Sequence, residues 1–122
     1  MDLMPFFKSV LEQDRAPVVL CDLAHTVIYM NKAAANRYGG YRLMGKSLMN
    51  CHSPETRKTI QKVIDWFAEG SENSIVYESR NDEENKDVYM VALRDGDGTL
   101  IGYYEKHEYR DRETLPFYGF DK

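Results

Sequence analysis

Residues 16–34 read APVVLCDLAHTVIYMNKAA and contain the strand and helix signals from which the fold class follows. Val, Ile and Tyr concentrate in residues 18–22 and again in residues 26–31, as they do in half-buried β-strands. The short segment between these runs leaves room for a tight turn, so we expect the two runs to pair as an antiparallel hairpin. The alanines that follow predict a short helix over residues 32–38, which the next two glycines end.

Two amphipathic helices are predicted on either side of this region. Apolar residues recur at helical spacing in residues 3–13 and in residues 60–67, so each segment should carry one apolar stripe. Ser53 is a favourable N-cap and Pro54 suits the first turn, so the second helix should begin there. Gly70 is a suitable residue to end it.

The last third of the chain changes to the alternating pattern of strands. We expect strands over residues 73–80, 87–94 and 99–108, with the sequence Asp-Gly-Asp-Gly at 95–98 forming the tight turn between the last two. Helices and strands are segregated along the chain, which favours an α+β domain built on an antiparallel sheet.

Composition limits the class of protein. The chain has 122 residues, 43% of them hydrophobic, which suits one domain with a real core. The net charge is −4 and the basic residues are scattered, so we expect no nucleic-acid partner. No apolar run approaches the roughly 20 residues of a membrane span, so no membrane association is expected.

The two cysteines indicate a compartment. The N-terminus lacks the basic and apolar regions of a signal peptide. We therefore expect a cytoplasmic protein in which Cys21 and Cys51 are reduced thiols.

Three phrases, in this order, resemble the PAS domain family. They are the hairpin quoted above, the sequence GKSLMNCHSP at residues 45–54 and the sequence RDGDGTLIGYY at residues 94–104. The second phrase is similar to a bacterial subgroup with a Cys-His-Pro phrase before the long helix. The resemblance spans residues 14–108 and implies a five-stranded antiparallel sheet with helices on one face. Residues 1–13 then form an N-terminal amphipathic helix, and residues 109–122 a C-terminal tail.

The resemblance also implies a function. PAS modules are sensory domains that bind a small ligand in a largely apolar pocket and signal to a protein partner. We expect no effector domain after residue 108, and therefore output through a separate partner, or through a homodimer formed by the helix at residues 3–13. The sequence holds no catalytic motif that we recognise, and we expect no enzyme. A ligand-free interaction adaptor, whose pocket its own side chains fill, is the alternative from another class.

His52 is the residue that the resemblance selects for a cofactor. Heme-binding PAS proteins use a histidine of a helical segment as the iron ligand, and a neutral imidazole suits iron. The position of His52 before a helix N-terminus disfavours its protonated form. A heme-dependent redox or gas sensor, or a heme carrier, is therefore an alternative function. The simpler interpretation is that His52 orients the helix and contacts no cofactor.

The other candidate pocket residues follow from the same resemblance. Asn50-Cys51 superficially matches the reactive phrase of flavin PAS domains, but the residues after it differ, so we do not expect flavin chemistry. His107 is a second polar candidate if the closing strand turns it inward rather than Lys106. His25 lies in a predicted turn and is expected to be exposed. The predicted apolar wall consists of Tyr29, Met30, Met44, Leu48, Met49, Ile60, Val63 and Ile64.

Overall fold

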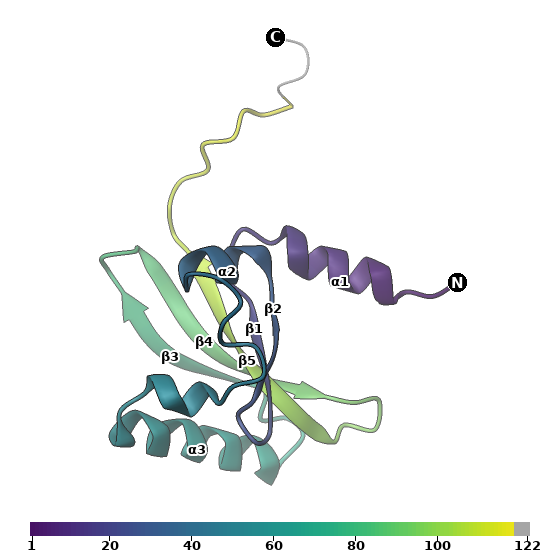
Figure 1. The fold of residues 1–122 in the computed structure, drawn as a ribbon, viewed down its shortest axis with the longest axis vertical. Helices are drawn as coiled ribbons and strands as arrows, with labels where there is room; N and C mark the ends of the chain where they lie inside the picture. Colours follow the sequence, from purple (N-terminus) through teal and green to yellow (C-terminus); the bar gives the residue numbers. More distant parts are fainter. Residues whose placement is uncertain (119–122) are drawn as a thin grey trace.

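Residues 1–118, the part of the chain that the computed structural model describes, contain one five-stranded sheet (Figure 1). Its strand order is β2-β1-β5-β4-β3, and every neighbouring pair is antiparallel. The predicted fold class is confirmed. The strands are β1 (Val19–Asp22), β2 (Val27–Met30), β3 (Ile75–Asn81), β4 (Lys86–Arg94) and β5 (Leu100–Tyr109).

The helices form where the sequence predicts them, at α1 (Met4–Gln13), α2 (Lys32–Arg37) and α3 (Pro54–Glu69). A single 3-10 turn, η1 (Leu48–Cys51), precedes α3. The Ser53 side chain accepts a hydrogen bond from the Thr56 amide, which is the predicted N-cap of α3.

The core lies between the inner face of the sheet and the helices α2 and α3. Ile60, Ile64 and Phe67 supply the buried stripe of α3, and Ala34 comes from α2. They pack against Cys21, Val27, Met30, Met90 and Tyr103 of the sheet. Strand alternation places every second residue of β4 and β5 on this face, and therefore positions the walls of any pocket there.

Asn31 joins three elements at the edge of the core and is fully buried. Its Oδ1 atom accepts hydrogen bonds from the amides of Ala34, at 2.9 Å, and Val18, at 3.0 Å. Its Nδ2 atom donates to the carbonyl oxygens of Leu11, at 2.9 Å, and Ala16, at 3.0 Å. The C-terminal end of α1 is therefore anchored to the domain by the same residue that caps α2.

The apolar stripe of α1 does not cover the domain. None of the residues Met4–Gln13 is buried, and Figure 1 shows the helix extending away from the sheet. Phe6, Phe7 and Val10 are 58%, 59% and 70% exposed. Within residues 1–118, no helix is both long and apolar enough to cross a membrane.

The expectation that His25 is exposed is wrong. His25 has a φ of 65°, and this left-handed backbone turns its side chain inward beneath α3. Its Nδ1 atom lies 2.8 Å from the Tyr103 hydroxyl, and its Nε2 atom lies 2.9 Å from Gln61 Oε1. The imidazole is thus a buried structural link between the β1–β2 turn, β5 and α3.

Candidate functional site

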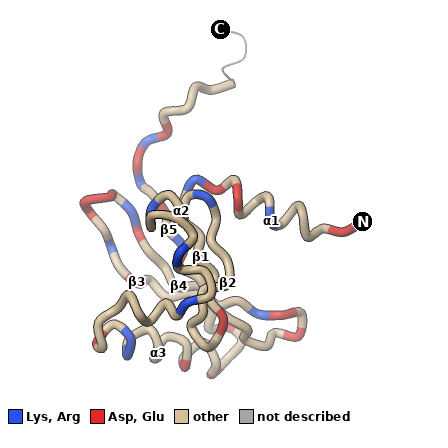
Figure 2. Tube along the Cα trace, in the orientation of Figure 1, with Lys and Arg blue, Asp and Glu red and all other residues tan. Residues whose placement is uncertain are grey.

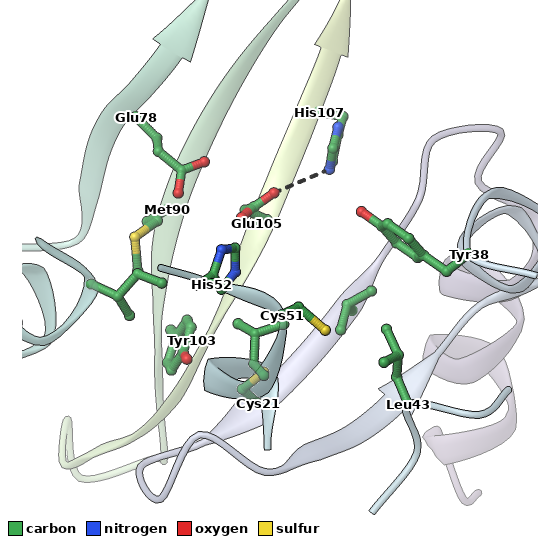
Figure 3. Close-up of a pocket in the computed structure, with 13 residues that line it drawn as sticks. Cys21, Tyr38, Leu43, Cys51, His52, Glu78, Met90, Tyr103, Glu105 and His107 are labelled. Carbon is green, nitrogen blue, oxygen red and sulfur yellow. Dashed lines mark ion pairs between the residues drawn. The ribbon is translucent and has the colours of Figure 1, made fainter. Parts of the chain in front are cut away.

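A cavity of about 160 Å³ lies between the sheet and the segments α2, η1 and α3 (Figure 3). Its deep part is formed mainly by apolar side chains of the sheet and helices. Its other part carries two carboxyl groups and two imidazoles. The lining residues are Val19, Cys21, Tyr38, Leu43, Leu48, Cys51, His52, Ile60, Glu78, Met90, Tyr103, Glu105 and His107.

Strand alternation along β5 places its polar residues in the cavity. Tyr103, Glu105 and His107 all face inward, and Glu105 lies opposite Met90 in the register of β4. Lys106 faces outward, where its ammonium lies 2.6 Å from a carboxylate oxygen of Glu108. Of the two candidate residues on this strand, His107 therefore lines the cavity.

Glu78 reaches the cavity at an irregularity in β3. Tyr77 pairs with Tyr89 and Ser79 with Val88, so Glu78 is the extra residue of a β-bulge. Bulges redirect side chains and are common beside functional sites. Figure 3 shows the Glu78 carboxyl group directed toward Glu105 on β5.

The environment of the two carboxyl groups favours their protonated forms. Burial raises the pKa of Glu78 to about 7, and the nearby Glu105 carboxylate contributes to this rise. Burial also raises the pKa of Glu105, while the Lys86 ammonium and the Arg37 guanidinium nearby oppose this rise. Near neutral pH the pair therefore carries less than two negative charges.

His107 is neutral in the folded protein. Its side chain is 4% exposed, and its Nε2 atom lies 3.5 Å from Glu105 Oε1. Burial lowers its pKa to about 4, and the cations Lys86 and Arg37 contribute to this fall. Among the residues that the structure describes, the Nδ1 atom has no hydrogen-bond partner.

A second buried charge lies beside the cavity. The Lys86 side chain is 2% exposed, with its Nζ atom 3.5 Å from Glu84 Oε2 and 5.4 Å from the centre of the Tyr109 ring. Glu84 also forms an ion pair with Arg37 of α2. This network fixes Lys86 through Glu84 rather than through the carboxylates of the cavity.

The cavity thiols differ in exposure. Cys51 is exposed, Cys21 is buried, and both are free. Burial raises the pKa of Cys21 to about 11, so this thiol stays protonated and behaves as a small apolar wall residue.

The structure brings together five of the eight cofactor-binding residues predicted from sequence: Leu48, Cys51, His52, Ile60 and His107. Met49 packs against the core, and Ile64 is buried within it, so neither lines the cavity.

The expectation that Tyr29 forms part of the pocket wall is wrong. Tyr29 pairs with Leu20, whose other partner is Tyr104, and these residues occupy the outer face of the sheet. The Tyr29 hydroxyl donates a hydrogen bond to the Glu12 carboxylate of α1. Met44 was also predicted to line the pocket, but it is 41% exposed and lies outside it.

Sequence reasoning missed the two carboxyl groups. The alternation that selects His107 on β5 also selects Glu105, two residues earlier, but a glutamate in a strand usually faces solvent. Alternation along β3 likewise places Glu78 on the face of Val76, two residues earlier, which packs against the core, and the same expectation of an exposed glutamate hides it.

The cavity does not fit heme. Its volume is close to that of a cavity of about 150 Å³ known to hold one benzene molecule, whereas a porphyrin has four linked pyrrole rings. In residues 1–118, no group of three or more His, Cys, Asp or Glu side chains could hold a metal ion.

Comparisons with known proteins identify the fold. No family model and no curated protein matches the sequence. A PAS domain from Colwellia psychrerythraea superposes with a TM-score of 0.65 at 14% identity, covering 88% of this chain and 97% of that one. A sensory box sensor histidine kinase from Vibrio cholerae gives a TM-score of 0.57 at 14% identity, covering 85% and 86%.

An RNA-binding light-oxygen-voltage receptor is also similar, with a TM-score of 0.60 at 15% identity. The match covers 88% of this chain and 33% of that one. The chain has the PAS fold that its three sequence segments implied.

Proposed function

We propose that this chain is a small-ligand-binding sensory module that signals to a protein partner or to a second copy, and that it performs no catalysis. The cavity carries the proposal, since it combines an apolar wall with a few converging polar groups, as ligand sites do. Its position between the sheet and α3 would let a ligand bias how these elements pack.

Mass spectrometry under non-denaturing conditions tests this proposal on the purified chain. We expect an added mass that corresponds to one small molecule and disappears on denaturation. Leu48→Trp should remove it, because the larger side chain fills the cavity that Leu48 lines. Leu23→Trp is the matched control, since Leu23 is 45% exposed and lies away from the cavity.

The ligand-free adaptor makes the opposite prediction. The adaptor would be favoured if the mass is the same before and after denaturation, for protein purified from several growth conditions. Under that alternative, Leu48→Trp would also leave partner binding unchanged.

A homodimer through α1 is the proposed route of self-association. Asn31 anchors the end of the helix, while the apolar side chains Phe6, Phe7 and Val10 remain exposed. A second copy can cover this stripe with its own, because a two-fold interface presents the same patch from both sides. Sedimentation velocity should show a dimer that Phe7→Glu dissociates and Lys8→Glu does not. A wild-type monomer at all concentrations would contradict this route.

Heme ligation by His52 stays a prediction, and the size of the cavity weighs against it. Titration with hemin, followed by visible spectroscopy, decides between the outcomes. A sharp Soret band at one heme per chain that His52→Ala abolishes would establish ligation. Weak absorbance unchanged in the variant would eliminate it.

The absence of a nucleic-acid partner also stays a prediction. Acidic and basic residues alternate along the trace of the fold, without a continuous basic stripe over residues 1–118 (Figure 2). One similar structure is described as RNA-binding, so a filter-binding assay with single-stranded RNA at low salt is the direct check.

A further inference from the structure

The carboxyl groups of Glu78 and Glu105 face one another without a cationic partner. Among residues 1–118, no lysine or arginine forms an ion pair with either group. The contact of Glu105 with His107 is made to a neutral ring, whose Nε2 atom lies 3.5 Å away. Two acidic groups therefore meet at the cavity with no lysine or arginine paired to either of them.

His107 independently indicates that the site is incomplete. Its ring lines the same cavity, and its side chain is only 4% exposed. Its Nδ1 atom has no hydrogen-bond partner within the described part of the chain. Buried polar atoms in folded proteins nearly always have a partner, so a water or a ligand in the cavity that this ring lines is expected to complete its hydrogen bonds.

The size and polarity of the cavity define the rest of the ligand. About 160 Å³ accommodates a body of roughly one six-membered ring, by comparison with the cavity of about 150 Å³ that holds benzene. Val19, Ile60 and Met90 offer it an apolar wall. Figure 3 shows both carboxyl groups near Met90, at the end of the cavity away from Cys21 and Leu43.

We propose that the cavity binds a small organic cation, with a protonated amine between Glu78 and Glu105 and an apolar body of about one ring against the wall. This assignment rests on the proposed ligand-binding function and adds the chemical class of the ligand. The ammonium group would displace a proton from the pair of carboxyl groups.

The exchange of a proton for an ammonium group makes binding depend on pH. The charged groups around the pair are Lys86 on β4, Arg37 on α2 and Glu84 before β4. The other titratable groups are His107 and Tyr103 on β5, Cys21 on β1, Tyr38 after α2, and Cys51 and His52 before α3. His107 stays neutral between about pH 6 and about pH 8, because its pKa of about 4 lies below this range. With a pKa of about 7 at Glu78, affinity should rise about tenfold over this range. The same titration in His52→Gln removes any contribution from His52.

Three probes of similar shape and different charge show how much of the affinity depends on charge. Benzylamine, benzyl alcohol and benzoate share one ring and differ in charge, and their dissociation constants follow from NMR titrations of the Met90 and Tyr103 signals. At about pH 8 we expect benzylamine to bind about tenfold or more tightly than benzyl alcohol, because a charge-assisted contact is stronger than a neutral one. Benzoate should not bind, since like charges repel.

Conservative variants test the residues. Glu78→Gln and Glu105→Gln keep the shape of the site, and each should bring the affinity for benzylamine close to that for benzyl alcohol and flatten its pH dependence. Glu108→Gln is the control, because Glu108 lies on the same strand, faces outward and contacts Lys106. Its affinity for benzylamine should match the wild type.

The outcomes distinguish the two proposals. Equal affinities for benzylamine and benzyl alcohol, with shifts at Met90, would overturn the cation assignment and leave the ligand-binding cavity standing. Tighter binding of benzoate would do the same. No shift at Met90 with any probe, up to its solubility limit, would overturn both.

Discussion

Replacing Glu78 with glutamine should stabilise the domain at alkaline pH and leave its stability at acidic pH almost unchanged. In the folded protein the pKa of Glu78 is raised from 4.5 to about 7. Between these two values the folded state holds more protons than the unfolded chain, so the wild type loses stability as the pH rises through this window. A glutamine side chain has no proton to lose, so the variant should escape this loss.

The magnitude follows from the shift. A rise of about 2.5 units corresponds to at most about 3.4 kcal/mol, at about 1.36 kcal/mol per unit. Glu78 is an exposed residue, and solvent screening therefore reduces the effect, so we expect about 1 kcal/mol. The free energy of unfolding from urea titrations, measured by circular dichroism at about pH 4.5, 6, 7 and 8, gives the profile.

His107 gives the stability of the domain the opposite dependence on pH. The pKa of His107 is lowered from 6.5 to about 4, so the unfolded chain binds more protons in this window and stability falls as the pH falls. In the wild type the two slopes oppose each other, and the comparison of Glu78→Gln with wild type removes the contribution of His107. Glu83→Gln, in the exposed β3–β4 turn, is the control. An equal effect of Glu78→Gln at about pH 4.5 and about pH 8 would refute the assignment.

Three further substitutions test the packing by the same urea titration. Asn31→Ala should lower the free energy of unfolding by about 3–4 kcal/mol, because it removes an N-cap and leaves buried backbone groups without partners. Asn36→Ala, at an exposed residue, should change it little. A loss of less than about 1 kcal/mol in Asn31→Ala would contradict this. Arg94→Met should lower the free energy of unfolding by about 2 kcal/mol, since the guanidinium donates to three carbonyl oxygens at and after the end of α3. An unchanged midpoint of the urea titration would show that these hydrogen bonds are dispensable. Tyr103→Phe should lower the free energy of unfolding by about 1 kcal/mol, because it removes the hydrogen bond with His25. An unchanged free energy of unfolding would show that this hydrogen bond does not stabilise the domain.

Much of the fold is predictable from local sequence signals. The cap at Ser53 and the spacing of Ile60, Ile64 and Phe67 define α3, because an N-cap and a 3.6-residue period act within one element. The five strands follow in the same way from alternation and turn residues, to within a few residues at each end. The order of strands in the sheet does not follow from these local signals, because it depends on contacts between distant segments.

The cavity was less predictable, since its polar residues depend on long-range geometry. Glu78 lies on the same face as Val76 by alternation, but a glutamate in a strand usually faces solvent, so the sequence does not select it. His25 is buried because one residue adopts a left-handed backbone in a turn that looks solvent-exposed in sequence. Tyr29 was assigned to the wrong face, because a register shift between Leu20 and Cys21 disturbs the alternation of the hairpin.

Hydrogen–deuterium exchange of the chain, with and without saturating benzylamine at about pH 8, tests most directly that a small molecule occupies this cavity. Binding should slow exchange in η1, at the start of α3 and in residues 103–107 of β5, all of which adjoin the cavity. The turn at residues 95–98 should exchange at an unchanged rate. Exchange that is unaltered throughout, or slowed equally at that turn, would contradict the account.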